Sequence, residues 1–403
     1  MSLIVQKFGG TSVADAERLR HVAKIITDTY AQGHRVVAVL SAQGDTTDEL
    51  IEKAKEINPN PSPREMDMLL STGEQISVSL CAMAIEAMGY PVVSLTGWQS
   101  GVLTNTVSMN ARIKRLDTER VEAELDRRRI VIVTGFQGIN RLGDITTLGR
   151  GGSDTSAVAL AAAIHADLCQ IYTDVDGVYT ADPREVKGAR KLDEITYNEM
   201  LELATLGAQV LHNRSVEMAK KYNVKLEVLS SFTGRPGTKI KEVAKGVEKS
   251  YISSVAKDKN IARIALLGVP DETGTSFKVF SLLAANNINV DIILQGIGQA
   301  ERKDICFTVA EGDLEKASGL LREHQESIGF RSMETNADVA KVSVVGAGMI
   351  GSPGVAAKLF EALYDAGINI NMISTSEIKI SVLVDRKDAA KAVQVIHYKF
   401  FAM

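Results

Sequence analysis

The 403-residue sequence contains only three cysteines, and this scarcity excludes two structural classes. Cys81, Cys169 and Cys306 are widely spaced and odd in number, so they make neither a disulfide framework nor a set of zinc ligands. We interpret them as small core residues of a protein in a reducing compartment. No metal site is predicted from them.

Long hydrophobic runs and a strong charge of either sign are also missing. Lys7 and two glycines follow only four apolar or near-apolar positions, which is too short for a signal peptide. No later run approaches the ~20 residues that span a bilayer. The net charge of -4 gives no general attraction to nucleic acid, and the basic run 127–129 follows three acidic residues. We therefore expect a cytoplasmic protein that binds neither a membrane nor a nucleic acid.

The composition that remains is that of a globular protein with several domains. Hydrophobic residues make up 45% and charged residues 24%. The length predicts two to four domains at roughly 100–200 residues each. Up to about residue 229, short apolar runs alternate with amphipathic segments, which is typical of an α/β layer with a mostly parallel sheet. The predicted strands are 4–8, 36–41, 91–95, 130–134 and 168–173, and the predicted helices are 14–30, 64–88 and 155–166.

The C-terminal part contains an internal repeat. Gly274, Phe280, Leu283, Ile288, Asn289 and Ile293 recur 80 residues later as Gly354, Phe360, Leu363, Ile368, Asn369 and Ile373. Both copies read strand, glycine-containing loop, helix and strand, and a further strand closes each copy, at 304–309 and 378–384. A unit of roughly 70 residues buries little surface alone, so we expect it to pair with its sister or with another chain. The turn cluster 233–238 and the charged stretch 239–249 form the predicted linker.

The first motif that carries chemistry is Lys7-Phe8-Gly9-Gly10-Thr11-Ser12, at the end of the first strand. Glycines let backbone N–H groups approach an anion, a helix N-terminus adds partial positive charge, and Lys7 supplies a full one. The alternative is an ordinary turn with Thr11 or Ser12 as the helix N-cap. It is not a Walker A loop, because the chain has no G-x-x-x-x-G-K-[ST] pattern.

The second motif, Gly149-Arg150-Gly151-Gly152-Ser153-Asp154, also opens a helix. Two such loops at the ends of neighbouring strands would place two positive helix ends over one crevice. Arg150 can bind a carboxylate with two parallel hydrogen bonds. The alternative for Asp154 is a first-turn acid that complements the helix dipole.

The third motif runs from Tyr172 to Arg184 and has the polarity of a nucleotide pocket. Asp174 and Asp176 suggest a cation loop instead, but the Ca²⁺ pattern fails because Val178 and Thr180 stand where oxygen donors belong. His165 and His212 have no plausible Cys or carboxylate partner pattern, and we interpret them as helix-end or packing residues.

One motif suggests a different enzyme. Residues 346–351 form a G-x-G-x-x-G after a strand-like segment, the context of a dinucleotide site. Asn371 stands about where the ribose-binding acid should be, and only 52 residues follow Gly351. The repeat gives these glycines another role, so a dehydrogenase is disfavoured.

The motifs together resemble the aspartokinase family of the amino-acid kinase superfamily. The likeness rests on KFGGTS, SAQGDTTDEL at 41–50, STGEQIS at 71–77, GRGGSD, YTDVDGVYTADPR and the duplicated tail. It implies an amino-acid kinase fold, a mostly parallel sheet sandwiched by helices, followed by two α+β ferredoxin-like ACT domains, one inserted in the other. The implied domains are a catalytic domain at 1–245, a first ACT domain at 262–337, and a second at 250–261 with 338–403.

The resemblance also implies the reaction. The γ-phosphate of ATP, bound with Mg²⁺, passes to the β-carboxylate of L-aspartate to give 4-phospho-L-aspartate, the first step of lysine, threonine and methionine biosynthesis. Lys7, which neutralises the phosphoryl group, and Asp154, which orients it, are the implied catalytic residues. The implied nucleotide residues are Lys7, Gly9, Gly10, Thr173, Asp174, Tyr179, Asp182 and Arg184. The implied aspartate residues are Ser41, Thr47, Glu74, Arg150 and Ser153.

The tail implies feedback regulation by lysine, threonine or both. The implied effector residues are Asp271, Gly274, Ser276 and Gln295 of the first unit, with Asn369, Ile370 and Ser376 of a partner's second unit. The implied assembly is a homo-oligomer through the ACT domains, or a hetero-oligomer with a shorter subunit made of the tail alone. Gln209 stands where many relatives carry Lys, and Gln43 and Asn213 replace an expected Met and Pro, which puts nucleotide affinity in doubt.

Two rival functions remain open from the sequence. One is a kinase of the same superfamily that acts on glutamate, an N-acetylated amino acid, carbamate or a nucleotide. Arg150 with Glu74 favours a zwitterionic α-amino acid, because one side chain suits its carboxylate and the other its ammonium. The other rival is a ligand sensor whose kinase half has lost activity. Since a side-chain carboxylate is ionised at pH 7, the expected chemistry needs no general base.

Overall fold

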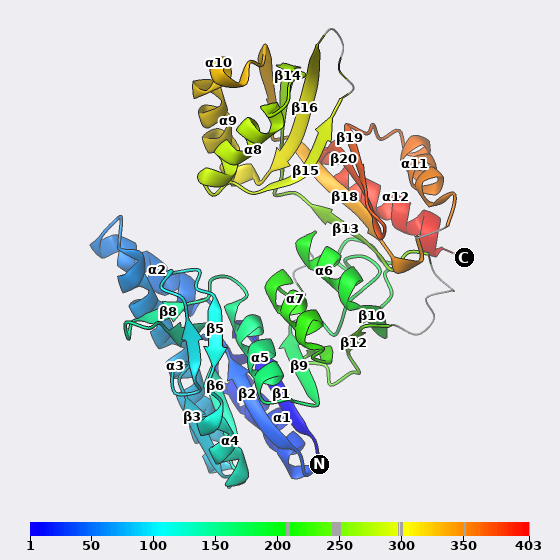
Figure 1. Cartoon of the computed structure of the whole chain (residues 1–403). Helices are drawn as coiled ribbons and strands as arrows, with labels where there is room; N and C mark the ends of the chain where they lie inside the picture. The colour runs from blue at the N-terminus through cyan, green and yellow to red at the C-terminus, as the bar shows by residue number, and fades with distance from the viewer. Residues whose placement is uncertain (207–209, 244–250, 297, 299–300, 350–351, 403) are drawn as a thin grey trace. The chain divides into compact units, whose positions relative to one another are not determined.

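The computed structural model describes residues 1–206, 210–243, 251–296, 298, 301–349 and 352–402. The chain folds into two compact units (Figure 1). The first comprises Met1–Val178, Lys191–Thr205 and Gln209–Lys245. The second comprises Tyr179–Arg190, Leu206–Ala208 and Gly246–Met403. The chain therefore leaves the first unit after Val178 and returns to it at Lys191.

An eight-stranded sheet forms the centre of the first unit, in the order β10-β12-β11-β9-β1-β2-β6-β3. Its strands are β1 (Leu3–Phe8), β2 (Arg35–Leu40), β3 (Val92–Leu95), β6 (Ile130–Thr134), β9 (Leu168–Thr173), β10 (Glu194–Thr196), β11 (Leu226–Ser230) and β12 (Thr238–Lys241). All neighbours are parallel except β11 and β12. The five predicted strands are confirmed, because strands buried on both faces read as apolar runs.

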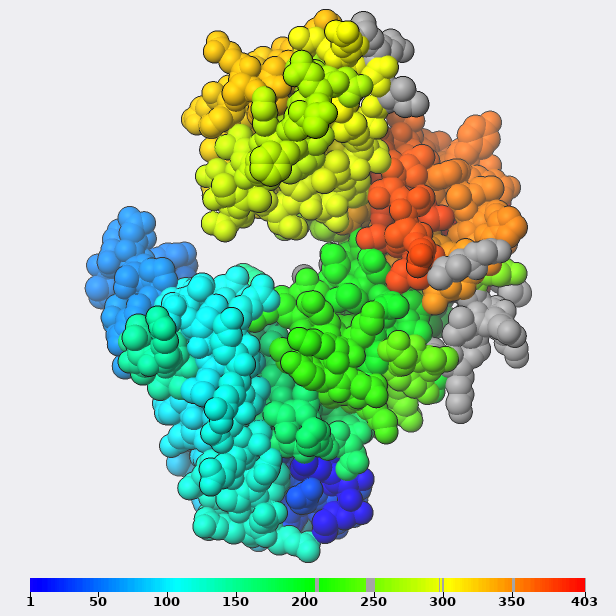
Figure 2. Space-filling model, viewed as in Figure 1, coloured from blue at the N-terminus to red at the C-terminus, as the bar shows by residue number. Residues whose placement is uncertain are grey.

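Helices cover this sheet. They are α1 (Ala16–Ala31), α2 (Thr46–Ile57), α3 (Pro63–Ala87), α4 (Glu119–Asp126), α5 (Gly152–Ala163), α6 (Tyr197–Thr205) and α7 (Asn213–Tyr222). The predicted helices correspond to α1, α3 and α5, although α5 begins three residues earlier than expected. Helix α2 was not predicted; it has no buried residue and projects from the rest of the first unit (Figure 2).

The long helix α3 is the described helix that could cross a membrane by length and composition. Half of the 18-residue apolar stretch of α3 is buried inside the fold. Asp67 and Glu74 lie on its buried face, so α3 is a core helix that also carries polar groups. Charged residues interrupt the apolar run of α3, and the expectation that no later segment approaches spanning length is corrected by this 25-residue helix.

A small sheet in the order β5-β4-β7-β8 also belongs to the first unit. Its strands are β4 (Val102–Thr104), β5 (Ile113–Leu116), β7 (Gln137–Ile139) and β8 (Ile145–Thr147). Strands β7 and β8 form an antiparallel hairpin that leads directly into the glycine-rich turn at Gly149.

The second unit contains two four-stranded antiparallel sheets, β15-β16-β14-β17 and β13-β18-β20-β19. The strands are β13 (Ser254–Asp258), β14 (Ala262–Pro270), β15 (Val290–Gln295), β16 (Arg302–Val309), β17 (Ser332–Asn336), β18 (Val339–Val345), β19 (Met372–Thr375) and β20 (Lys379–Asp385). The helices are α8 (Thr275–Ala285), α9 (Leu314–Glu323), α10 (Gln325–Ile328), α11 (Val355–Asp365) and α12 (Ala389–Phe401). Gly274 and Gly354 cap α8 and α11 with φ of 92° and 97°, which is the left-handed region that glycine tolerates.

The two sheets of the second unit share a small core. Ile261, Ile292, Val339, Met372 and Leu383 pack together, which joins both copies of the repeat. β13 precedes the first copy in the sequence, yet it pairs with β18 of the second copy. Since β18 lies in an antiparallel sheet, the segment after it is not the first turn of a dinucleotide-binding fold. Ile350 and Gly351 of that motif lie outside the described residues.

Candidate active site

The end of β1 and the start of α5 bring Lys7 and Asp154 together. The Lys7 ammonium lies 2.7 Å from Oδ1 of Asp154, and both side chains are about one-tenth exposed. The other oxygen, Oδ2, accepts a hydrogen bond from the His212 backbone N–H at 3.4 Å. This pair joins two glycine-rich segments that are about 145 residues apart in the sequence, and it places the Lys7 ammonium at the carboxyl edge of the sheet.

The turns after β1 and β2 approach each other closely because glycine occupies both. A Cβ on Gly10 would lie 2.9 Å from the carbonyl oxygen of Ala42, and a Cβ on Gly9 would lie 3.4 Å from the Lys7 Nζ. The N–H of Gly44 donates to the carbonyl of Gly10 at 3.0 Å. This close approach of the two turns requires glycine at position 10, beside Lys7.

The alternative reading of the first motif, with Thr11 or Ser12 as an N-cap, is wrong. Asp15 caps α1 by accepting from the Arg18 N–H. The buried hydroxyl of Ser12 instead lies 2.8 Å from that of Ser231, which follows β11.

Glu74 is a buried carboxyl beside the turn that follows β2. Its side chain lies on α3, 2% of the residue is exposed, and Oε1 accepts from the Ala42 N–H at 3.2 Å. Within the described part of the chain, its second oxygen Oε2 has no hydrogen-bond partner. Burial raises the pKa of Glu74 to about 8, although the Ala42 N–H and the nearby Gln137 side chain act in the opposite direction. When it is ionised, this carboxyl can accept a cationic ligand group at Oε2.

The remaining residues implied for aspartate lie on neighbouring segments of the first unit. Ser41 follows β2, and its N–H donates to the Phe8 carbonyl at 3.1 Å. Thr47 is in the first turn of α2 and is partly buried. Ser153 is buried in the first turn of α5, where a Cβ on Gly135 would lie 2.6 Å from its hydroxyl.

Arg150 lies at the tip of the turn before α5 and is exposed. The flanking Gly149 and Gly151 have φ of 78° and 67°, so this tight turn requires glycine on both sides. A Cβ on Gly151 would lie 2.2 Å from the His212 ring. His212 caps α7, as expected of a helix-end residue, and it also shapes this turn. No carboxylate among the described residues pairs with the Arg150 guanidinium.

Asp67, which was not predicted as a site residue, stabilises the segments next to the turn of Arg150. This fully buried residue of α3 accepts from the Met109 N–H at 3.0 and 3.1 Å and from the Thr147 hydroxyl at 2.6 Å. Burial raises the pKa of Asp67, and these hydrogen bonds partly oppose the rise. The available signal was its spacing, because Asp67 and Glu74 are two acids seven residues apart on one face of an otherwise apolar helix.

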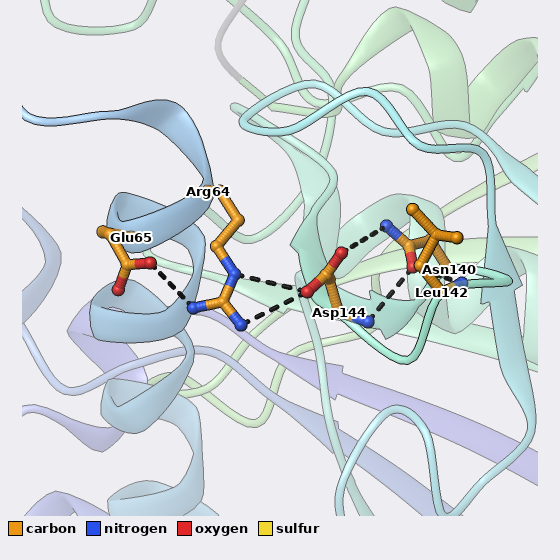
Figure 3. A network of polar contacts seen from close by, with 5 residues as sticks. All are labelled: Arg64, Glu65, Asn140, Leu142 and Asp144. Atoms are coloured by element: carbon orange, nitrogen blue, oxygen red, sulfur yellow. Dashed lines mark hydrogen bonds and ion pairs between the residues drawn. The ribbon is translucent and has the colours of Figure 1, made fainter.

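The first turn of α3 holds the same hairpin at its other end (Figure 3). Arg64 donates to Oδ1 of Asp144 from two nitrogens, at 3.3 and 3.2 Å, and to Glu65 at 2.8 Å. The side chain of Asn140 accepts from the N–H groups of Leu142 and Asp144, which closes the tip of the β7–β8 hairpin. The β7–β8 hairpin, which leads to Arg150, is thus bonded to α3 at two residues, Asp67 and Arg64.

The residues implied for the nucleotide are divided between the two units. Thr173 ends β9 in the first unit and Asp174 follows it, and the Thr173 hydroxyl donates to Asp174 at 3.1 Å. Tyr179, Asp182 and Arg184 belong to the second unit. Arg184 donates to both oxygens of Asp182, at 2.7 to 3.2 Å, and this contact lowers the pKa of that carboxyl. Gln209 lies outside the described residues.

The residues implied for the effector lie in the second unit. Ser276 and Gln295 are brought together, with the hydroxyl donating to Oε1 at 3.1 Å. Asp271 follows β14 and pairs with Lys303 at 2.8 Å, and Gly274 caps α8. Asn369, Ile370 and Ser376 flank β19 in the second copy of the repeat. Across the described residues, no group of three or more His, Cys, Asp and Glu side chains could hold a metal ion.

Known proteins share both parts of this architecture. The amino acid kinase family matches residues 2–230, and the ACT domain family matches residues 264–325 and 342–400. Aspartokinase of Bacillus sp. (strain MGA3) is 50% identical over 400 residues, which cover 99% of this chain and 97% of that protein. Aspartokinase 2 of Bacillus subtilis (strain 168) is 50% identical over 401 residues, 99% of this chain and 98% of that protein.

The chain is also similar to solved structures of aspartokinases. The structure of E. coli aspartokinase III in complex with aspartate and ADP has a TM-score of 0.84 at 28% identity, and the match covers 99% of this chain and 100% of that chain. The lysine and aspartate complex of the same enzyme has a TM-score of 0.76 at 27% identity and covers 99% of both chains. The chain belongs to the aspartokinase family, and its fold is an amino-acid kinase domain followed by ACT domains.

Proposed function

We propose that this protein transfers the γ-phosphate of ATP to the β-carboxylate of L-aspartate and forms 4-phospho-L-aspartate. The Lys7–Asp154 pair at the carboxyl edge of the sheet is the observation that carries the proposal. Its relatives are aspartokinases, and one solved relative holds aspartate and ADP. A place at the start of lysine, threonine and methionine biosynthesis and a cytoplasmic location follow as part of the same proposal.

The chemistry needs positive charge and alignment more than it needs a base. The attacking β-carboxylate has an unperturbed pKa near ~4, so it is ionised at pH 7. Lys7 neutralises charge on the transferring phosphoryl group, and Asp154 holds the ammonium in place within 2.7 Å. Mg²⁺, held mainly by the phosphates of ATP, supplies further positive charge when it is bound.

Recognition of aspartate divides between two charged side chains. The exposed guanidinium of Arg150 binds the α-carboxylate with two hydrogen bonds. Oε2 of Glu74 accepts the α-ammonium, which supplies the partner that this buried oxygen lacks within the described protein. Ser41, Thr47 and Ser153 add hydroxyl groups around the substrate. A ligand with an acylated amino group would leave Glu74 unpaired, and this disfavours an N-acetylated substrate.

The nucleotide contacts come from segments that follow β1 and β9. Gly9 and Gly10 offer backbone N–H groups to phosphate, and Thr173 and Asp174 lie at the end of β9. Tyr179, Asp182 and Arg184 complete the set.

The Lys7→Ala variant tests the assignment directly. We expect kcat to fall by at least ~10²-fold, the effect of removing one electrostatic stabiliser. A coupled assay of ADP release with aspartate measures this, and Lys24→Ala, an exposed lysine of α1, is the matched control. A Lys7→Ala variant as fast as wild type would remove Lys7 from the mechanism.

A wild-type protein with no ATP turnover would favour the pure ligand sensor. A substrate panel with glutamate, N-acetylated amino acids, carbamate and nucleotides separates the kinase alternatives.

We further propose that the second unit binds lysine, threonine or both next to Asp271, Gly274, Ser276 and Gln295. Asn369, Ile370 and Ser376 of a second copy complete the site. β15 and β19 are edge strands and carry the exposed apolar residues Ile293, Leu294 and Ile373, which favours pairing with another chain. Isothermal titration with each amino acid tests the effectors. Native mass distinguishes a homo-oligomer from an assembly with a shorter ACT-only subunit.

The proposed domain boundaries are 1–245 for the kinase, 262–337 for the first ACT domain, and 250–261 with 338–403 for the second. The pairing of β13 with β18 supports the assignment of 250–261 to the second ACT domain. Residues 179–190 lie within the kinase domain by sequence but pack in the second unit.

A further inference from the structure

The segment Tyr179–Arg190 is part of the hydrophobic core of the second ACT domain. Ala181 and Val186 are buried in one cluster with residues of β13, β18 and α12. The N–H of Val255 in β13 donates to the carbonyl of Thr180 at 2.8 Å. A segment fixed by both core packing and a backbone hydrogen bond takes its conformation from the domain that it packs in.

A buried polar contact ties this segment to α12. The hydroxyl of Thr180 lies 2.8 Å from Nε2 of His397, and each residue is 4% exposed. The same hydroxyl accepts from the Arg190 N–H at 3.0 Å, so His397 reaches the point where the two ends of the segment meet. Loss of His397 would leave the Thr180 hydroxyl with the Arg190 N–H alone, and loss of the hydroxyl would deprive the buried Nε2 of His397 of this partner.

The rest of α12 reinforces this contact. Gln394 donates from its side chain to the carbonyl of Glu185 at 3.0 Å. Arg190 donates to the carbonyl of Phe401 at 2.8 Å. The Phe401 ring stacks on His397 with centroids 4.6 Å apart. One face of α12 therefore holds the middle and the end of the segment.

The buried residues Thr180 and Ala181 stand between the proposed nucleotide residues Tyr179 and Asp182. Thr180 and Ala181 are buried, whereas the neighbouring Asp182 and Arg184 are more accessible and pair with each other. We propose that His397 is a positioning residue for the nucleotide: through Thr180, helix α12 of the second ACT domain sets the conformation of 179–184 and hence the affinity for ATP. This inference rests on the proposed nucleotide role of Tyr179, Asp182 and Arg184.

The test compares His397→Ala and His397→Gln with Tyr398→Ala, a neighbouring substitution at an exposed position of α12. His397→Ala should raise KM for ATP and Kd for ADP by ~3- to 10-fold, the equivalent of one net hydrogen bond. KM for aspartate and kcat at saturating ATP should change less than about twofold, because the Lys7–Asp154 site keeps its own supports. His397→Gln should recover part of the affinity, since its amide can bond to the Thr180 hydroxyl. Tyr398→Ala should match wild type.

A purely structural role for His397 predicts a different result. His397→Ala would then lower Tm, while the folded protein would keep wild-type KM for ATP and Kd for ADP, and this result would overturn the inference. If His397→Ala does not fold, Thr180→Val, which removes only the hydroxyl, decides the question by the same readouts. Wild-type protein that binds no ADP would instead refute the proposed function.

Discussion

The raised pKa of Glu74 leads to a quantitative prediction for substrate binding. With a pKa of about 8, this carboxyl is mostly protonated in the free protein at pH 7. The aspartate ammonium binds the ionised form, so binding must release the proton. The apparent affinity for aspartate then falls by a factor of 1 + 10^(8 − pH), which is about tenfold at pH 7 and about 100-fold at pH 6. KM for aspartate should therefore decrease as pH rises and level off above about pH 8.

Initial rates at saturating ATP between pH 6 and pH 9 measure this dependence. Glu74→Gln should bind aspartate weakly with little pH dependence in that range, because the variant has no carboxyl to ionise. Glu65→Gln, at an exposed acid in the first turn of α3, is the control and should follow wild type. Equal values of KM at pH 6.5 and pH 8.5 in wild type would refute the reasoning.

The same group affects stability with a defined sign. Its pKa is higher in the folded chain than in the unfolded chain, so its contribution is fully present below about pH 4.5 and is lost as pH rises through about 8. The gain in Tm from Glu74→Gln over wild type should consequently be larger at pH 9 than at pH 6. A gain that is equal at both pH values would contradict an ionising Glu74.

Three further variants test the support of the site. Asp67→Asn should cost ~1–3 kcal/mol of stability and raise KM for aspartate more than KM for ATP, because it weakens the hold on the turn of Arg150; chemical denaturation and kinetics measure both. Gly151→Ala should destabilise the fold more than Gly143→Ala, since both have positive φ but only the first Cβ would strike His212; equal losses of Tm would contradict this. Arg150→Lys should raise KM for aspartate by about tenfold, the effect of losing bidentate geometry, with kcat nearly kept.

Five central strands and the glycine turn of the kinase half were predictable because their signals are local, whereas the small sheet of β4, β5, β7 and β8 and the strands β10–β12 were not predicted. β1, β2, β6 and β9 are short apolar runs, and the glycines around Arg150 mark a turn that requires positive φ. Asp67 was not predictable in the same way, because its partners Met109 and Thr147 are distant in the sequence. Only the folded chain brings them to α3.

The C-terminal tail also combines elements that the sequence predicted with elements that it did not. The 80-residue repeat predicted two similar units, and the structure confirms them. The second helix of each copy, α9 and α12, was not predicted, since the repeated residues lie in the first helix and its flanking strands. Nor does any periodicity reveal that Ala181 and Val186 pack with a helix more than 200 residues later.

That packing decides how the protein can be dissected. An isolated kinase fragment ending near residue 245 would carry Ala181 and Val186 without the core that covers them. A C-terminal fragment that starts after the linker would have a gap in the same core, and His397 on α12 would lack its Thr180 partner. Each fragment would expose part of this core, so expression of both together, with 179–190 supplied in trans, is the arrangement in which the gap can be refilled.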